Sequence, residues 1–487
     1  MNCTGACFAL AKNCLLISSS IFVIVSCGQA GQGVGHESNE RETAVSIVGD
    51  QFQINGAPTY EGRIWTAADG REYPVEGLLM NARLVQGVFD DLNPETRGQW
   101  AYPDTRQWDP DRNSREFTGA LASWREHGLL SYTINLQGGC PYGYCRNQPW
   151  DNSAFVPDGS LREGYMDRLE QVLDRTDELG MVAILGYFYF GQDDNLEDES
   201  AVIRAVENAT EWVLDKGYTN VIVEINNECN IRYDDHEILQ CERVHELIER
   251  AQNIERDGRS LYVSTSLAGG RVPSANIVEA SDYILLHGNG VQDPERMVQM
   301  IRETRELDGY TPMPIVNNED DQPWRASGQG WTGESNNFAA AVKNYTSWGY
   351  FDFRRDTERN DFNLGYQSVP VNWHISSERK RDFFDLLAEF TGSPGTPKVS
   401  LDVSRETNTV SVQIEGERDD APVDQVELLI NNQVVDSARE KPFEFRISEV
   451  PAGDHGVRAR VTYRNGQRDV IVESPYYQNL WWPYGGI

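Results

Sequence analysis

The chain has 487 residues, enough for two or three domains of ordinary size. Hydrophobic residues make up 39% of the sequence and aromatic residues 10%, so a large core is expected and extensive disorder is not. Its 43 basic and 76 acidic residues give a net charge of −33. This charge excludes broad binding to nucleic acid or to anionic lipid, because both partners need a basic surface. A neutral or locally recognised ligand fits the composition better.

The first 26 residues have the pattern of a secretory signal peptide. Lys12 precedes an apolar run over 15–25, and the segment contains no acidic residue. The run is shorter than the ~20 apolar residues that a membrane-spanning helix needs. The sequence IVSC at 24–27 resembles a bacterial lipobox, which implies a lipid on Cys27; a chance cysteine near an ordinary cleavage site is the alternative. We therefore expect an exported protein, anchored by lipid to the bacterial outer membrane or cell surface.

The remaining cysteines fit an exported protein. They are Cys140, Cys145, Cys229 and Cys241. An even number in an exported chain favours disulfides. The close spacing makes Cys140–Cys145 a natural short staple and leaves Cys229–Cys241 as the second bond, although three pairings are formally possible. A metal site is the alternative, but neither spacing matches a zinc pattern.

The body of the chain alternates between strand and helix patterns. Residues 45–65 predict a β-hairpin around Asn55-Gly56. Eight candidate strands follow, at 79–85, 129–136, 181–190, 221–226, 261–266, 283–287, 314–317 and 349–353. The clear helix patterns between and after them are at 161–179, 199–216, 234–256, 294–307, 336–348 and 377–390. Eight such units over about 320 residues predict an α/β fold of the (β/α)8 TIM-barrel type. A doubly wound sheet is the alternative, but the Gly-rich loop expected after its first strand is missing.

The expected domain order follows from these patterns. The signal peptide spans 1–26, a flexible tether 27–44, the barrel with its N-terminal hairpin 45–392, and a Pro/Gly-rich linker 393–397. Short alternating strands over 398–475 predict an immunoglobulin-like β-sandwich. Residues 476–487 form a separate aromatic tail.

Polar residues at the strand ends are the candidates for chemistry, because barrel active sites form there. The fourth and seventh strands end alike, in an aliphatic run, two Asn and a Glu. These strands lie across the barrel mouth from one another, so Glu228 and Glu319 can face one cavity. Paired carboxylates suit acid and nucleophile roles at a glycosidic bond. The alternative is that both are ordinary acidic loop residues in an acidic protein.

The chain resembles glycoside hydrolase clan A, retaining (β/α)8 enzymes with catalytic Glu on strands four and seven, and is most similar to cellulase-like family 5. The stretch VIVEINNECN at 221–230 fits the family pattern but has Cys229 where the family usually has Pro. By this resemblance Glu228 is the acid/base, Glu319 is the nucleophile, and Asn227 binds the hydroxyl next to the anomeric carbon.

The same resemblance implies further contacts. Arg83 fits an Arg near the nucleophile, and His287 fits a His that contacts the sugar or the nucleophile. The Trp often found after strand eight is missing, and Trp373 is the candidate substitute. We also expect sugar contacts from Asn135, Tyr187, Asn289, Asn318, Trp324 and Trp331. For the Trp residues, ordinary packing of long loops is the alternative.

The implied mechanism is double displacement between carboxyl groups ~5–5.5 Å apart. Arg83 would favour the ionised form of Glu319, and the charge of Glu319 would favour a proton on Glu228. We expect a monomer that hydrolyses O-glycosidic bonds of a poly- or oligosaccharide, without cofactor or metal. Its membrane contact would be the lipid anchor alone. A non-catalytic glycan-binding lipoprotein is the alternative, and an inverting hydrolase or a lyase is a further one. A neutral glycan is the easier substrate, since a polyanionic one would need Arg clustered at the mouth.

Overall fold

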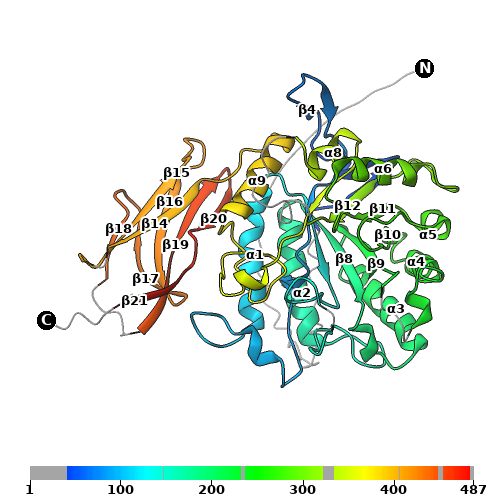
Figure 1. Cartoon of the computed structure of the whole chain (residues 1–487), viewed down its shortest axis with the longest axis horizontal. Helices are drawn as coiled ribbons and strands as arrows, with labels where there is room; N and C mark the ends of the chain where they lie inside the picture. Colours follow the sequence, from blue (N-terminus) through cyan, green and yellow to red (C-terminus); the bar gives the residue numbers. More distant parts are fainter. Residues whose placement is uncertain are drawn as a thin grey trace, which may run out of the picture. The chain divides into compact units, whose positions relative to one another are not determined.

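The computed structural model describes residues 41–145, 147–231, 236–321, 334–404, 406–447 and 453–482 (Figure 1). The predictions for the signal peptide, the tether as far as residue 40, Cys27, Trp324 and Trp331 lie outside these residues. Within the described ranges, no helix is both long enough and apolar enough to cross a membrane.

Eight parallel strands form a closed barrel, as the sequence predicts. They are β6 (Asn81–Ala82), β7 (Ser131–Asn135), β8 (Val182–Tyr189), β9 (Val221–Asn227), β10 (Val263–Ser264), β11 (Ile284–His287), β12 (Ile315–Glu319) and β13 (Gly349–Tyr350). The sheet order is β10-β9-β8-β7, and β11 pairs with β12 and β13 with β6. Single parallel bridges join Arg83 to Thr133 and Val316 to Ser347. The Asp282 N–H donates to the Val263 carbonyl and closes the remaining gap between β10 and β11.

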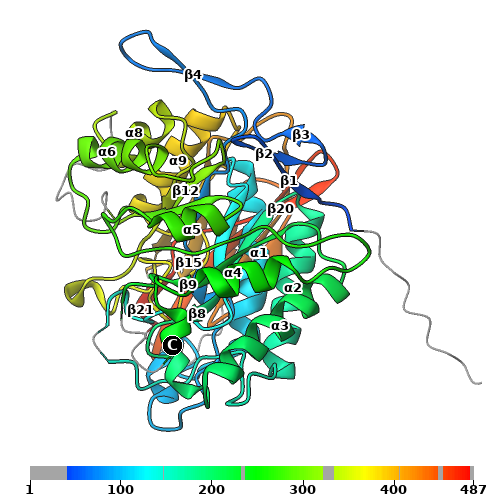
Figure 2. The same ribbon diagram turned by 90° about the vertical axis from the view of Figure 1, so that its right-hand side faces the viewer.

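Helices follow the strands around the outside of the barrel. They are α1 (Pro110–Glu126), α2 (Glu163–Glu178), α3 (Glu199–Asp215), α4 (His245–Gln252), α5 (Ala275–Ala280), α6 (Pro294–Arg305), α8 (Asn337–Lys343) and α9 (Glu378–Thr391). Figure 2 shows α3, α4 and α5 in front of β8 and β9. Local signals set their ends: the Asp198 carboxylate caps the first turn of α3, and α9 ends at the left-handed Gly392.

The helix predicted over 234–256 is much shorter in the structure. A 3-10 turn occupies Glu237–Leu239, and α4 begins only at His245. Cys241, between these two elements, is bonded to Cys229 at the end of β9. This bond fixes Cys241 to the end of β9.

A small antiparallel sheet packs against the N-terminal end of the barrel. It consists of β1 (Val45–Val48), β2 (Gln51–Ile54) and β3 (Ala57–Pro58), and the predicted Asn55-Gly56 turn joins β2 to β3. The Phe52 side chain of β2 is fully buried. It packs in one cluster with Leu79, Leu130, Val182, Ile184, Ile222, Tyr283, Leu285 and Val316. Since this end is filled by apolar side chains, the polar chemistry is left to the opposite end.

The C-terminal part consists of two antiparallel sheets. One contains β14 (Lys398–Ser404), β15 (Thr409–Glu415) and β18 (Glu444–Arg446). The other contains β16 (Val423–Ile430), β17 (Gln433–Ala438), β19 (Gly453–Asn465), β20 (Arg468–Glu473) and β21 (Tyr477–Trp482). Because β21 pairs with β19, the tail predicted as separate from the sheets joins them as far as Trp482.

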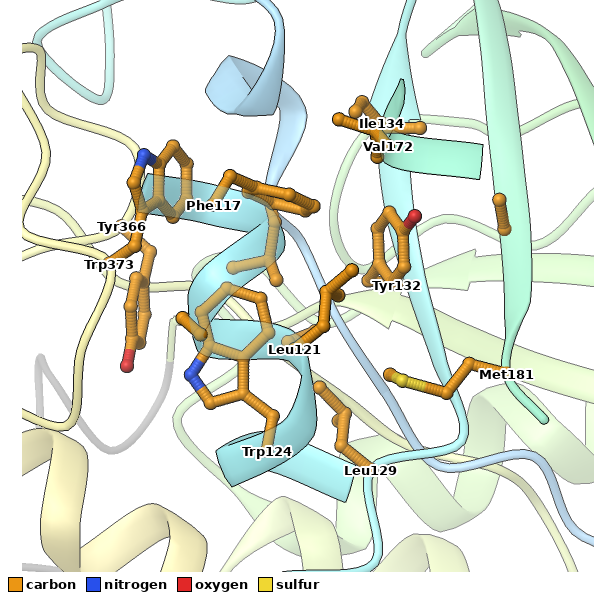
Figure 3. Packing of buried hydrophobic residues seen from close by; sticks show 14 of the residues in the cluster. Phe117, Leu121, Trp124, Leu129, Tyr132, Ile134, Val172, Met181, Tyr366 and Trp373 are labelled. Atoms are coloured by element: carbon orange, nitrogen blue, oxygen red, sulfur yellow. The ribbon is translucent and has the colours of Figure 1, made fainter. Parts of the chain in front are cut away.

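Helix α1 packs on two sides. Figure 3 shows side chains of α1 between two aromatic residues that follow β13 and a group from the barrel; the labelled residues include Phe117, Leu121, Trp124, Tyr366, Trp373, Tyr132, Ile134 and Met181. Two carboxylates of α1 also contact the C-terminal sheets. Glu126 lies 3.5 Å from Arg468, and Glu116 lies 3.5 Å from Arg458.

The packing of Phe52 generates a stability prediction. Phe52→Ala removes a fully buried ring, so we expect the free energy of unfolding in urea to fall by about 3–5 kcal/mol. Val48→Ala on the same sheet is the matched control, because Val48 is 56% exposed, and its effect should stay within ~0.5 kcal/mol. Equal losses in the two variants would contradict the role assigned to Phe52.

Candidate active site

Glu228 is held at the end of β9 in an unusual backbone conformation. Its φ is +57°, in the left-handed region that residues with a Cβ adopt only at an energetic cost. The Glu228 N–H donates to Ser266 Oγ at 3.0 Å, and the Cys229 N–H donates to the Ser266 carbonyl at 3.0 Å. The next residue, Cys229, is bonded to Cys241. These bonds fix the position from which the Glu228 side chain projects, and that side chain is almost buried.

Glu319 is the last residue of β12, and both of its carboxylate oxygens have partners. Arg83 Nε forms an ion pair with Oε2, and Asn289 Nδ2 donates to Oε1 at 2.5 Å. Asn317 Oδ1 accepts from the Glu319 N–H at 3.2 Å. The carboxylate is therefore oriented from two sides, and it is only 5% exposed.

His287, at the end of β11, links the two glutamates. Its Nδ1 lies 2.9 Å from Glu228 Oε1 and 3.7 Å from Glu319 Oε2. One oxygen of each glutamate and a ring nitrogen of His287 all lie within 4.8 Å of one another. The fourth and seventh strands thus bring the two predicted carboxylates to one place.

A third carboxylate, Glu224, lies in this cluster and was not predicted as a site residue. It is fully buried in β9, and Arg83 Nη1 lies 3.6 Å from its Oε2. Arg83 Nη2 also donates to Asn227 Oδ1 at 2.6 Å. The sequence carried one signal for Glu224, because an acid inside an aliphatic strand needs a buried partner.

The shared charges shift two pKa values. Burial raises the pKa of Glu319 above its ordinary value, with Arg83 and His287 opposing that effect. Arg83 therefore favours the ionised form, as predicted, but burial is the larger influence. Burial alone would lower the pKa of His287, yet the charges of Glu319 and Glu228 outweigh it and raise that pKa. His287 thus keeps its positive charge to a higher pH than an ordinary histidine.

A pocket of about 320 Å³ lies over this cluster. Its lining includes Glu228, Asn289, Tyr189, Tyr144 and Cys145. The Cys140–Cys145 disulfide closes the loop that forms one wall. The pocket is the space in which a ligand reaches Glu228.

Of the predicted site residues, Arg83, Asn227, Glu228, His287, Asn289 and Glu319 come together. Tyr187 does not, because its hydroxyl lies 3.0 Å from Thr210 Oγ1 on α3, outside the barrel. The predicted sugar contact of Tyr187 is therefore wrong. Tyr189, two residues further along β8, lines the pocket instead.

Three other predictions need correction or a new description. Trp373 is buried against α1, where its Nε1 donates to Asn113 Oδ1 at 3.0 Å, so it does not replace the missing wall Trp. Asn318 is buried inside the barrel, where its Nδ2 lies 3.3 Å from Glu224 Oε2, and supports that carboxylate instead of reaching the pocket. Asn135 is also fully buried, and in the described part of the chain its side-chain amide has no hydrogen-bond partner.

Glu228, His287 and Glu319 are also residue types that bind metal ions. Arg83, however, already contacts Glu319, and a fixed guanidinium charge at that distance repels a cation. The cluster is therefore better suited to proton transfer and nucleophilic attack than to holding a metal. The prediction that the protein needs neither metal nor cofactor stays a prediction.

No protein-family model matches the chain, and no curated protein matches it. Among solved structures, it is similar to the endo-β-1,4-mannanase from Thermotoga petrophila, with 12% identity, a TM-score of 0.38, and coverage of 84% of this chain and 99% of that one. It is also similar to a glycoside hydrolase family 5 protein from Bacteroides vulgatus, with 13% identity, a TM-score of 0.38, and coverage of 88% of this chain and 97% of that one. A putative glycoside hydrolase from the same organism shares 11% identity with a TM-score of 0.42, and the match covers 92% of this chain and 82% of that one. Likenesses this distant assign no function to the chain.

The disulfide beside Glu228 generates the second prediction. Removing it in the double variant C229S/C241S should lower the free energy of unfolding by about 3 kcal/mol, because the unfolded chain regains the entropy of an open loop. The matched control is C140S/C145S, which opens a shorter loop and should cost about 2 kcal/mol. Urea denaturation measures both, and an unchanged stability in C229S/C241S would contradict the prediction.

Proposed function

We propose that the protein is a retaining glycoside hydrolase of the clan A type, acting on the O-glycosidic bonds of an oligo- or polysaccharide. One observation carries the proposal: an oxygen of Glu228 and an oxygen of Glu319 lie within 4.8 Å of one another. Retaining glycosidases hold their carboxyl groups ~5–5.5 Å apart, whereas inverting enzymes leave ~6.5–9.5 Å for a water. The short separation supports direct attack by a carboxylate.

The first step is attack of Glu319 on the anomeric carbon. A new C–O bond forms to Glu319 while the bond to the leaving oxygen breaks, and that oxygen takes the proton of Glu228. Arg83 and Asn289 keep the Glu319 carboxylate oriented for this attack. Tyr189, Tyr144 and Cys145 line the pocket over the reacting centre.

The second step is hydrolysis of the glycosyl ester. Esterification of Glu319 leaves Glu228 as the free carboxylate next to the ester. Glu228 then takes a proton from a water molecule, and the water oxygen attacks the anomeric carbon and releases Glu319. His287, in contact with Glu228, stabilises its negative charge between the two steps.

The remaining parts of the proposal concern location and architecture. We propose that the protein is an exported monomer anchored through a lipid on Cys27, with a carbohydrate as its partner. The two antiparallel sheets after residue 398 are proposed to form an immunoglobulin-like sandwich. Their contacts with α1 support a spacer packed on the barrel.

A glycan-panel digestion tests the function. We expect the wild-type protein to hydrolyse at least one glycan, and Glu228→Gln to lower kcat by about 10²–10⁴-fold, because the leaving oxygen loses its acid. Glu319→Ala should abolish turnover, since it removes the nucleophile. Glu295→Gln, an exposed glutamate at the start of α6, is the control and should behave as wild type. Binding without hydrolysis of any glycan would favour the alternative, a glycan-binding lipoprotein.

The pH dependence tests the roles of Arg83 and Glu319. Glu319 must be ionised to attack, and its pKa is raised above 4.5, so the acid limb of kcat/KM should lie above pH 4.5. Arg83→Met removes a charge that lowers this pKa, so the acid limb should move to higher pH.

Two further variants make the Arg83 result interpretable. Arg83→Lys keeps the positive charge, so its acid limb should move to higher pH by less than that of Arg83→Met. Arg271→Met, at an exposed arginine, should leave the profile unchanged. An acid limb that does not move in Arg83→Met would contradict the role of Arg83.

A further inference from the structure

A second cavity, of about 250 Å³, is lined by three arginines. They are Arg106, Arg354 and Arg359, and we call this space the arginine cavity. Its volume is below the ~300–1,000 Å³ of sites for drug-sized ligands, which suits one substituted sugar unit. Three cations around one cavity are unusual in a chain whose net charge is −33.

We call the 320 Å³ pocket over Glu228 the catalytic pocket. The arginine cavity and the catalytic pocket border the same disulfide loop at 140–145. Tyr142 lines the arginine cavity, whereas Tyr144 and Cys145 line the catalytic pocket. The loop is attached to the segment after β13, because Gln367 Nε2 donates to the Cys140 carbonyl at 3.0 Å. Phe353, next to Arg354 in the chain, packs on Tyr144 with ring centroids 5.1 Å apart. Residues of one short loop thus line both spaces.

Arg354 is a buried cation without a carboxylate partner. It is 8% exposed, its Nη2 donates to the carbonyls of Ser368 and Pro370 at 2.6 and 2.8 Å, and its Nη1 donates to the Arg359 carbonyl at 3.1 Å. Within the described ranges, no carboxylate lies within ion-pair distance of Arg354 and its Nε has no hydrogen-bond partner. Burial lowers the pKa of Arg354 to about 10, with Asp361 and Asp352 opposing from a distance. A buried charge of this kind is costly until an anion compensates it.

The positive charges of the other two arginines, Arg359 and Arg106, are only weakly compensated by acidic residues. Arg359 pairs with Asp356 at 2.8 Å, but both side chains are mostly exposed, and such pairs contribute little. The Arg359 guanidinium also lies 5.1 Å from the centroid of the Tyr142 ring. Arg106 is exposed, and the described residues include no ion-pair partner for it. Asp356 is thus the only direct acidic partner of the three arginines within the described part of the chain.

We propose that the arginine cavity is an outer subsite that binds an anionic substituent, a carboxylate or a sulfate ester, carried by a sugar unit of the substrate. The inference rests on the proposed function, because it assigns a substrate class to the same enzyme. Guanidinium groups match the planar carboxylate and the oxygens of sulfate with paired N–H donors. Tyr142 supplies aromatic surface for the sugar ring. A charged glycan needs clustered arginines to bind it, and the arginine cavity supplies the cluster that Arg83 alone did not.

The test is calorimetric binding to the full chain carrying Glu319→Gln, which prevents turnover. The probes are matched pairs: oligogalacturonate with its methyl ester, and carrageenan oligosaccharides with their desulfated forms. We expect the charged member of at least one pair to bind more tightly. The added substitutions R106Q/R359Q should weaken that binding by about tenfold or more, as for lost hydrogen bonds to a charged group, and leave the neutral member unchanged. Arg354 is kept because its guanidinium donates to three backbone carbonyls.

The matched control is Arg355→Gln, at a partly exposed arginine of the same segment that does not line the cavity. It should bind every probe as the parent does. Absence of any preference for a charged probe, or an equal loss for the charged and neutral members, overturns the proposal. Inorganic sulfate is titrated alone: affinity equal to that of the sulfated oligosaccharide would make this a site for a free anion and also overturns it.

These outcomes are separate from those of the glycan digestion. Charge-dependent binding that is lost in R106Q/R359Q, together with no hydrolysis, overturns the hydrolase and leaves the anionic subsite. Hydrolysis with no effect of R106Q/R359Q on any charged probe overturns the subsite and leaves the hydrolase.

Discussion

The active-site geometry depends on one buried guanidinium. Arg83 contacts Glu319 and Glu224 and donates to Asn227, so a single cation links β9 and β12. Three carboxylates within reach of one another would repel if all were ionised without a counter-charge. Arg83 and His287 supply that counter-charge, and burial keeps their electrostatic interactions strong. The positions of the proposed nucleophile and acid follow from this balance of charge.

The rest of the fold serves to keep this charged cluster in place. The sheet β1–β3 fills one end of the barrel with Phe52 and its apolar neighbours, so the polar cluster occupies the other end. Both disulfides lie beside the catalytic pocket: one follows Glu228 directly, and the other closes the loop between the pocket and the arginine cavity. Covalent bonds of this kind suit an exported protein, in which thiols oxidise. They restrict two segments that border the pocket.

Much of the barrel could be predicted from the sequence, because continuous apolar runs and amphipathic helices report on local packing. Glu228 and Glu319 were found because a strand end fixes where its side chain goes. Tyr187 and Tyr189 show the limit, since both lie in β8, yet Tyr187 contacts α3 and Tyr189 lines the pocket. Trp373 was misassigned because its partners on α1 lie far away in the sequence. The arginine cavity could not be predicted for the same reason: its arginines come from distant loops.

The stereochemistry of the first product tests the central claim most directly. Proton NMR of the anomer formed at early times, before mutarotation, reports whether one displacement or two has occurred at the anomeric carbon. Two displacements, through an ester on Glu319, predict a product with the same anomeric configuration as the substrate. An inverted first product would contradict the assignment of Glu319 as nucleophile and Glu228 as acid/base.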